Sequence, residues 1–280
     1  MTRLAKRPFI IPVLSSGDTF LSGASLHRTV STWAGLSKIW DDPLNFLMTG
    51  ECVPFEFEMP SLDQVIGEIR RDPDARIVPG TGGDKLNLSD ISEEFSKRSI
   101  EDAVESRFQM SHFKLPNFYG PGQLLHGFEE KVMDPWRERL ANAGFTWTRC
   151  YPIIFISGPG CGTNYHVDRS HVIAWQRHGV KRFVGLKDPL RWVPFEDRML
   201  PGGEIVRHPD LSEEDELAYE MHPGDVLWNA LLTPHWVEAA DHATYSFNLS
   251  HGGLRLNGKL CPFEQELEVY KAKQERAELR

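Results

Sequence analysis

The chain has 280 residues, and 40% of them are hydrophobic, including eight tryptophans and sixteen phenylalanines. Such a composition can build a substantial core, which excludes a disordered protein and favours one catalytic domain with extensions. The formal charge of −9 argues against a general affinity for nucleic acid or for an anionic membrane, since both require a basic surface. No segment approaches the roughly 18 consecutive apolar residues of a membrane span.

Cysteine usage and the first residues bear on the cellular compartment. The four cysteines are far apart and form no CxxC pair, a spacing that fits neither a disulfide scaffold nor a structural zinc site. The apolar run at residues 9–14 is too short for the core of a signal peptide and contains Pro12. We therefore expect a cytoplasmic protein with reduced cysteines, which are Cys52, Cys150, Cys161 and Cys261.

Residues 1–145 carry mostly helical signals, and we expect a helical N-terminal region that packs on the core. The segment 61–64 has the sequence of a capping box, and apolar residues follow it at helical spacing through Ile69. Apolar residues four apart, such as Val104 and Phe108, continue the helical pattern through a charged stretch. Residues 126–142 predict a further helix that ends before Gly144.

From residue 146 the pattern becomes that of β-structure. Short apolar segments are separated by Gly, Pro or Asp, as is typical of an antiparallel sandwich or a small barrel. We expect a catalytic core over residues 146–255, interrupted by a Pro-rich and then acidic insertion at 187–221. The predicted strands are residues 151–156, 171–176, 182–186, 225–229, 236–239 and 244–249.

The last segment, residues 256–280, predicts a C-terminal helix that begins near Pro262. Its acidic residues precede its basic ones, in agreement with the helix dipole. Phe263, Leu267 and Tyr270 form an apolar stripe that has to be buried against another surface. We expect this surface to be a second subunit, which predicts a homodimer, and packing on the chain's own core is the alternative.

The strongest chemical signal is the sequence His166-Val-Asp168. Residues i and i+2 of an extended segment point to the same face, so this imidazole and this carboxylate can bind one ion. A third ligand has to come from a distant strand, and His235 is the candidate. Two histidines and one carboxylate on one face of an octahedral metal leave three positions open. The chain has eleven histidines, so this pattern alone is weak, and other histidines are expected in the core or on the surface.

The sequence around these residues adds specificity. Residues 158–168 (GPGCGTNYHVD), 176–183 (QRHGVKRF) and 223–227 (PGDVL), followed by the HWVE segment from His235, occur in this order. This arrangement resembles the JmjC and cupin-like family of Fe(II)- and 2-oxoglutarate-dependent oxygenases, and it is most similar to the asparaginyl hydroxylase group. The resemblance covers about residues 150–255.

The resemblance implies a mainly β fold, the double-stranded β-helix (jelly-roll or cupin) core, with a helical N-terminal region and a C-terminal helix. It implies Fe(II) held by His166, Asp168 and His235. It also implies a 2-oxoglutarate site to which Lys181, Thr163 and Asn248 contribute. Tyr119 and Tyr151 are both candidates for a further hydroxyl at that site.

The implied reaction uses dioxygen to hydroxylate an unactivated C–H bond of a small metabolite or a peptide side chain, and N-demethylation is the same chemistry on a methyl carbon. Nucleic acid and membranes are not expected as partners. Two other readings remain open. One is a metal-dependent cupin enzyme that does not use 2-oxoglutarate, and the other is a non-catalytic binding module.

Overall fold

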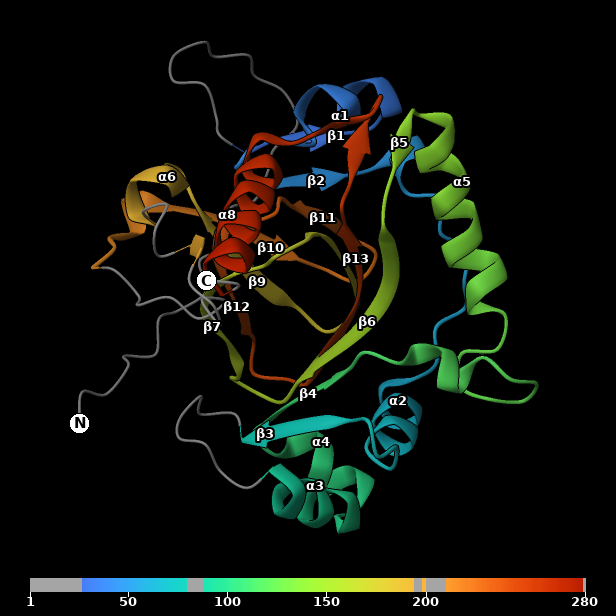
Figure 1. The fold of residues 1–280 in the computed structure, drawn as a ribbon. Helices are drawn as coiled ribbons and strands as arrows, with labels where there is room; N and C mark the ends of the chain where they lie inside the picture. The colour runs from blue at the N-terminus through green and yellow to red at the C-terminus, as the bar shows by residue number, and fades with distance from the viewer. Residues whose placement is uncertain (1–26, 80–87, 194–197, 200–209, 279–280) are drawn as a thin grey trace, which may run out of the picture.

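The computed structural model describes residues 27–79, 88–193, 198–199 and 210–278. Its largest element is an eight-stranded sheet that combines strands from both halves of the chain (Figure 1). The spatial order of this large sheet is β1 (Thr29–Val30), β2 (Phe46–Met48), β11 (Val226–Asn229), β8 (His171–His178), β13 (Thr244–Gly252), β6 (Arg149–Ser157), β4 (Phe108–His112) and β3 (Arg76–Pro79).

Two smaller sheets complete the β-structure. The four-stranded small sheet has the order β10 (Glu216–Met221), β9 (Lys181–Leu186), β12 (Pro234–Ala239) and β7 (Gly162–Val167). The third sheet contains β15 (Lys259–Leu260), β14 (Arg255–Leu256) and β5 (Phe145–Thr146). The fold is therefore strand-rich with large sheets, as expected for a jelly-roll type of architecture.

From β6 to β13 the chain passes back and forth between the large and the small sheet. β6, β8, β11 and β13 belong to the large sheet, while β7, β9, β10 and β12 belong to the small one. All pairings among these strands are antiparallel. The six strands predicted from the sequence are confirmed. β10 lies in the expected insertion at 187–221, whose residues 194–197 and 200–209 are outside the described part.

The N-terminal region is less helical than predicted, since β1 to β4 extend the large sheet at both edges. Phe108, which we expected on a helix, begins β4. The predicted capping box is present, because the backbone N–H of Gln64 donates to Ser61 Oγ and the Gln64 side chain accepts from the backbone N–H of Ser61. That cap explains why α2 begins at Leu62.

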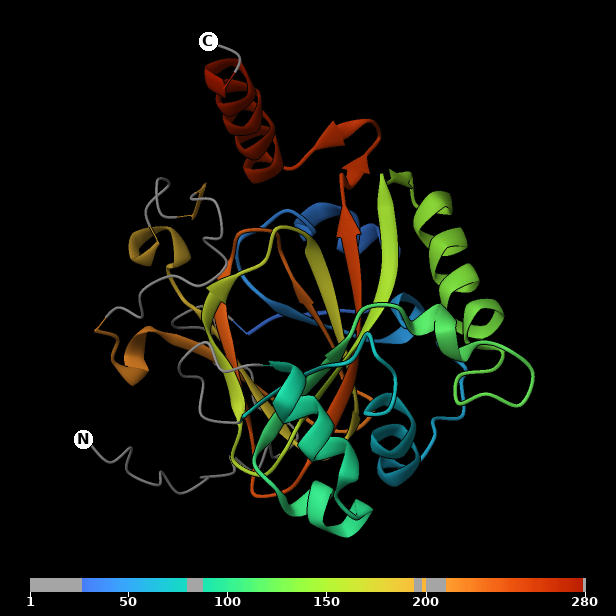
Figure 2. The same cartoon turned by 60° about the horizontal axis from the view of Figure 1, so that its bottom comes forward.

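Helices surround the sheets, and α5 lies beside β6 in both views (Figures 1 and 2). The C-terminal helix, α8, projects from one end of the sheets (Figure 2). Within the described residues, no helix combines the length and the apolar character that crossing a membrane requires. The α-helices are α1 (Trp33–Ile39), α2 (Leu62–Ile69), α3 (Leu88–Lys97), α4 (Ile100–Glu105), α5 (Asp134–Asn142), α6 (Pro189–Trp192) and α8 (Pro262–Glu278). Shorter turns are η1 (Gly50–Cys52), η2 (Leu115–Phe118), η3 (Glu129–Met133) and η4 (Glu213–Asp215).

Candidate metal centre

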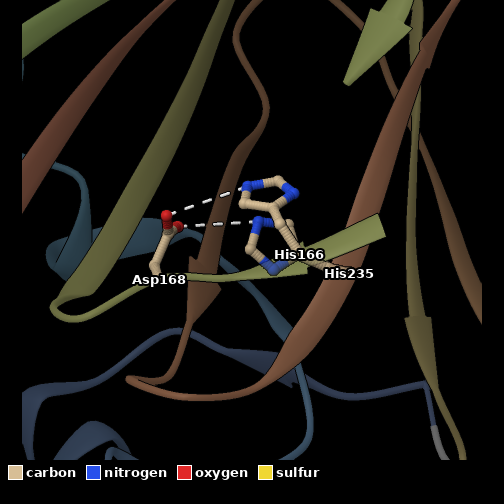
Figure 3. Close-up of side chains that lie close together, drawn as sticks. All are labelled: His166, Asp168 and His235. Carbon is tan, nitrogen blue, oxygen red and sulfur yellow. Dashed lines mark ion pairs between the residues drawn. The ribbon is translucent and has the colours of Figure 1, made fainter. Parts of the chain in front are cut away.

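Two neighbouring strands of the small sheet bring the three predicted ligands together (Figure 3). His166 lies on β7 and His235 on β12, and the two residues are direct partners in the antiparallel register. Asp168 follows β7, and its backbone carbonyl accepts a hydrogen bond from Leu232 N–H at 2.8 Å. Leu232 has a positive φ of 58°, so a tight turn before β12 keeps the carboxylate beside both imidazoles.

The distances in this cluster fit a shared ion better than direct hydrogen bonds. His166 Nε2 lies 3.8 Å from Asp168 Oδ1, and His235 Nε2 lies 3.5 Å from Asp168 Oδ2. The three ligand atoms all lie within 4.8 Å of one another. When nitrogen and oxygen ligands bind one ion at roughly 2 Å, neighbouring ligand atoms are about 3–4 Å apart. Little movement is needed to close this site on a metal.

Backbone carbonyls fix the protonation of both imidazoles. His166 Nδ1 lies 2.7 Å from the carbonyl oxygen of Asn164, and His235 Nδ1 lies 2.9 Å from that of Thr233. Because a carbonyl can only accept, each Nδ1 donates its proton to that carbonyl, and Nε2 is the ring nitrogen that can offer a lone pair. Both Nε2 atoms and the carboxylate therefore point to one place, an arrangement that suits a cation.

The surroundings of His235 keep it neutral and fixed. Burial, with a smaller contribution from the neighbouring His166, lowers the pKa of His235 to about 4. The Phe183 ring stacks on the imidazole with centroids 5.0 Å apart and planes at 7°. By contrast, 20% of the His166 side chain and 30% of the Asp168 side chain are exposed, so the centre is open to solvent on their side.

Lys181 extends from the small sheet to the large sheet. It is two residues before Phe183 on β9, so both side chains point to the face of His235. Its ammonium group donates to Ser246 Oγ at 3.2 Å and to the Phe155 carbonyl at 3.4 Å. In the part of the chain that the structure describes, no carboxylate pairs with it, and burial lowers the pKa of Lys181 to about 7. A buried ammonium of this kind is suited to receive an anion.

A β-bulge explains how Thr163 joins this face although it is three residues from His166. His235 pairs with His166 and Val237 pairs with Thr163. Between these two pairs, one residue of β12 lies opposite two residues of β7. Because His235 and Val237 point to one face, their partners do so as well. Thr163 Oγ1 accepts from the Val237 N–H at 2.9 Å, which leaves the hydroxyl proton for another acceptor.

Asn248 faces the same interior from the large sheet. It lies on β13 two residues after Ser246, the residue that contacts Lys181, so the two side chains share a face. The Asn248 side-chain oxygen is buried and has no hydrogen-bond partner among the residues that the structure describes. An orphaned polar atom of this kind is costly, and it indicates room for a ligand beside the centre.

Three further polar residues bear on the anchor of a carboxylate. Arg255 is on β14 and pairs with Glu268 of α8 at 3.4 Å. Among the described residues the buried Tyr119 hydroxyl has no hydrogen-bond partner, and its ring lies against Phe128. Tyr151, by contrast, lies opposite Ser250 in the pairing of β6 with β13, on the face that Ser246 and Asn248 share, so it stays a candidate.

A second group of ligand-type side chains, His171, Cys261 and Glu264, is fully buried, and its ligand atoms also lie within 4.8 Å of one another. In His171 the other ring nitrogen carries the proton, unlike in His166 and His235. The backbone N–H of Leu231 donates to His171 Nδ1 at 3.4 Å, so Nε2 carries the proton and offers no lone pair. We therefore do not interpret this group as a metal site.

Sequence reasoning missed three residues of the centre. Phe183 lies two residues after the predicted Lys181, and Ser246 lies two residues before the predicted Asn248. Because alternate residues of a strand share a face, strand periodicity could have indicated both. Asn229 contacts His235 Nδ1 through its side-chain amide at 3.4 Å, and no sequence pattern indicated it.

Comparisons with known proteins agree with this architecture. No family model matches the sequence, and no curated protein is similar to it. The fold is similar to the X-ray structure of YcfD from Escherichia coli, with a TM-score of 0.53, 17% identity, and coverage of 79% of this chain and 53% of that one. A second YcfD structure, described as a ribosomal oxygenase in complex with cobalt and 2-oxoglutarate, gives a TM-score of 0.44 at 18% identity and covers 80% of this chain and 50% of that one.

The chain therefore spans about half the length of the structures that it matches. At this identity the likeness concerns the fold alone. It agrees with the strand-rich architecture of large sheets that the sequence motifs led us to expect.

Proposed function

We propose that this chain is an Fe(II)- and 2-oxoglutarate-dependent oxygenase whose iron ligands are His166, Asp168 and His235. One observation carries the proposal: both Nε2 atoms and the carboxylate of Asp168 point to one place, because backbone carbonyls accept from each Nδ1–H. Two histidines and one carboxylate are the donor set of non-haem Fe(II) oxygenases, and they leave positions for co-substrate and dioxygen.

In this proposal Lys181, Thr163 and Asn248 bind 2-oxoglutarate. The Lys181 ammonium and the free proton of the Thr163 hydroxyl would hold the distal carboxylate, which is otherwise expensive to bury. The Asn248 amide, whose oxygen has no partner, lies on the face where the metal-bound end would be. The pocket thus combines a cation, a hydroxyl and a metal face, which suits a small dicarboxylate.

With Fe(II) and 2-oxoglutarate bound, such a centre couples decarboxylation of 2-oxoglutarate to succinate with oxidation of a C–H bond by dioxygen. The protein's own groups hold the co-substrate and orient the substrate on the exposed side of Asp168. We propose hydroxylation, with a small metabolite or a peptide side chain as substrate. YcfD is described as a ribosomal oxygenase, which supports a protein substrate.

We further propose that the alternation of strands between the two sheets is a double-stranded β-helix. Residues 146–255 would then be the catalytic core with the insertion at 187–221, residues 1–145 a region packed on it, and 256–280 a C-terminal element. The antiparallel order β6-β13-β8-β11 opposite β7-β12-β9-β10 supports this proposal. The four free cysteines support a reducing, cytoplasmic setting.

The test is to incubate the purified chain with Fe(II), 2-oxoglutarate and dioxygen and to measure succinate. Even without substrate we expect slow succinate release that depends on added iron. Iron binding without any binding of 2-oxoglutarate would favour a cupin enzyme of another kind. No iron binding by the folded chain would favour a non-catalytic module and contradict the proposal.

The pKa of Lys181 predicts a pH dependence for 2-oxoglutarate. Since burial lowers this pKa from 10.5 to about 7, the ammonium is progressively lost above neutral pH, and with it the partner of the distal carboxylate. We expect the KM for 2-oxoglutarate to rise by up to about tenfold per pH unit above pH 7, because binding takes up one proton. Lys181→Arg keeps its charge over this range and should lose the dependence. A KM for the unchanged protein that is independent of pH would contradict the assignment.

The apolar stripe of α8 packs on the chain's own core, as the alternative had it, so the stripe is not the surface for a homodimer. Leu267 is buried and belongs to the chain's own core, and Phe263 and Tyr270 pack against that core, while Val269 is 55% exposed. We propose that the face around Val269 forms the subunit contact. Val269→Glu should convert a dimer to a monomer in light scattering, whereas Gln274→Glu, at an exposed residue on another side of the helix, adds the same charge outside the contact. A monomeric unchanged protein would reject the proposal.

A further inference from the structure

A buried pair of asparagines lies directly behind His235. Asn45 and Asn229 are 0% and 1% exposed, and Asn45 Nδ2 lies 2.5 Å from Asn229 Oδ1. The other end of the Asn229 amide, Nδ2, lies 3.4 Å from His235 Nδ1. Asn229 ends β11 in the core, whereas Asn45 precedes β2 in the N-terminal region. The pair thus joins the two halves of the chain behind the metal centre.

The protonation of His235 determines how these amides have to be oriented. Nδ1 carries a proton, because it donates to the Thr233 carbonyl. The Asn229 amide should therefore turn its oxygen, not its nitrogen, toward Nδ1. A half-turn exchanges the two ends of an amide without moving the rest of the side chain. After a half-turn of both amides, Asn229 Nδ2 donates to Asn45 Oδ1, so the hydrogen bond between the two asparagines is kept.

Asn45 is held firmly in this place. A Cβ atom on Gly185 of β9 would lie 1.8 Å from the end of the Asn45 amide that does not contact Asn229. The amide therefore lies directly on the glycine backbone. The Tyr219 hydroxyl of β10 donates to the Asn45 carbonyl at 2.8 Å. Both contacts come from the small sheet. Asn45 is consequently fixed against β9 and β10 while its amide meets Asn229.

We propose that Asn229, held by Asn45, is a positioning residue that accepts a hydrogen bond from His235 Nδ1–H and orients this ring toward the metal. The inference rests on the proposed function, in which His235 is an iron ligand. Phe183 fixes the ring plane by stacking, and the Thr233 carbonyl and the Asn229 amide share the ring proton. A hydrogen-bonded imidazole is a better-oriented and more basic ligand. The N-terminal region therefore contributes to the metal centre as well as to the sheet.

Metal affinity tests this directly, with Co²⁺ as the probe in calorimetric titrations of the full chain. Asn229→Ala should weaken Co²⁺ binding by about 10–100-fold, as losing such an outer contact to a metal-bound histidine does. Asn229→Asp should restore it, because a carboxylate accepts from both Nδ1–H and the Asn45 amide. Asn45→Ala combined with Asn229→Ala should cost less than the sum of the single effects, since both act through one contact.

The matched control is Asn164→Ala. Asn164 contacts His166 only through its backbone carbonyl, and its side chain is exposed, so Co²⁺ affinity should not change. A second readout is the ¹⁵N NMR spectrum of the histidines in the metal-free protein, where Asn229→Ala should broaden or shift the Nδ1–H signal of His235. Equal Co²⁺ affinity in Asn229→Ala and the unchanged protein would overturn the inference alone. Absence of Co²⁺ binding by the unchanged protein would instead overturn the proposed function.

Discussion

Asp168→Ala is expected to abolish turnover and to lower metal affinity by more than about 100-fold, which exceeds the effect of losing an outer contact. Asp168 supplies the only negative charge of the three proposed ligands. Without it, two neutral imidazoles remain, one of which is exposed to water. His166→Ala and His235→Ala should likewise abolish turnover. The measurements are iron retained per chain and iron-dependent succinate release.

These variants should remain folded. The backbone carbonyl of Asp168, not its side chain, accepts the hydrogen bond from Leu232, and 30% of the side chain is exposed. The matched control is His242→Ala, which removes an exposed imidazole outside the centre and should retain full activity. Full iron-dependent activity in the Asp168, His166 and His235 variants would show that the ligands lie elsewhere.

The strands of the core were predictable because their composition is simple. Each predicted strand is a short, largely buried apolar run between Gly, Pro or Asp, so its assignment as a strand follows from the local sequence and needs no knowledge of its partner strands. β10 could also have been predicted from the sequence, since Leu217, Tyr219 and Met221 are buried and alternate with half-buried residues. The acidic residues before it concealed that alternation.

The strands of the N-terminal region could not be predicted in the same way. β1 and β2 are two and three residues long, too short for any periodicity, and they exist because β11 offers a free edge. For β4, Val104 and Phe108 suggested a helix through their spacing, but Ser106 ends α4 between them and Phe108 pairs with β3. The strand conformation of β1, β2 and β4 is therefore set by pairing with distant strands and not by local sequence.

The candidate centre was predictable in its residues and not in its chemistry. The HxD spacing and a distant histidine indicated which side chains meet. The carbonyls of Asn164 and Thr233, which decide where each imidazole carries its proton, have no signature in the sequence. Nor does the bulge that turns Thr163 toward His166. Both depend on the local path of the backbone.

Replacing Lys181 with methionine is expected to raise the KM for 2-oxoglutarate by roughly 30-fold or more while iron binding stays unchanged. Breaking a buried charged pair costs on the order of 2–5 kcal/mol, and each 1.4 kcal/mol corresponds to a factor of ten. Methionine fills a similar volume, so the loss concerns the ammonium and its hydrogen bonds to Ser246 and Phe155. Kinetics at varied 2-oxoglutarate, together with iron content, provide the measurement.

The same substitution should leave stability unchanged or increase it, and this separates a binding role from a structural one. Because the pKa of Lys181 is lower in the folded than in the unfolded chain, its charge lowers the free energy of unfolding. This destabilisation is fully present below pH 7, decreases as the pH rises, and is absent above 10.5, the pKa in the unfolded chain. Lys181→Met removes it, so the Tm near neutral pH should be maintained or rise. A lower Tm with an unchanged KM would show that Lys181 serves the core through Ser246. A higher KM with an undiminished Tm is the result expected of a residue retained for its ligand.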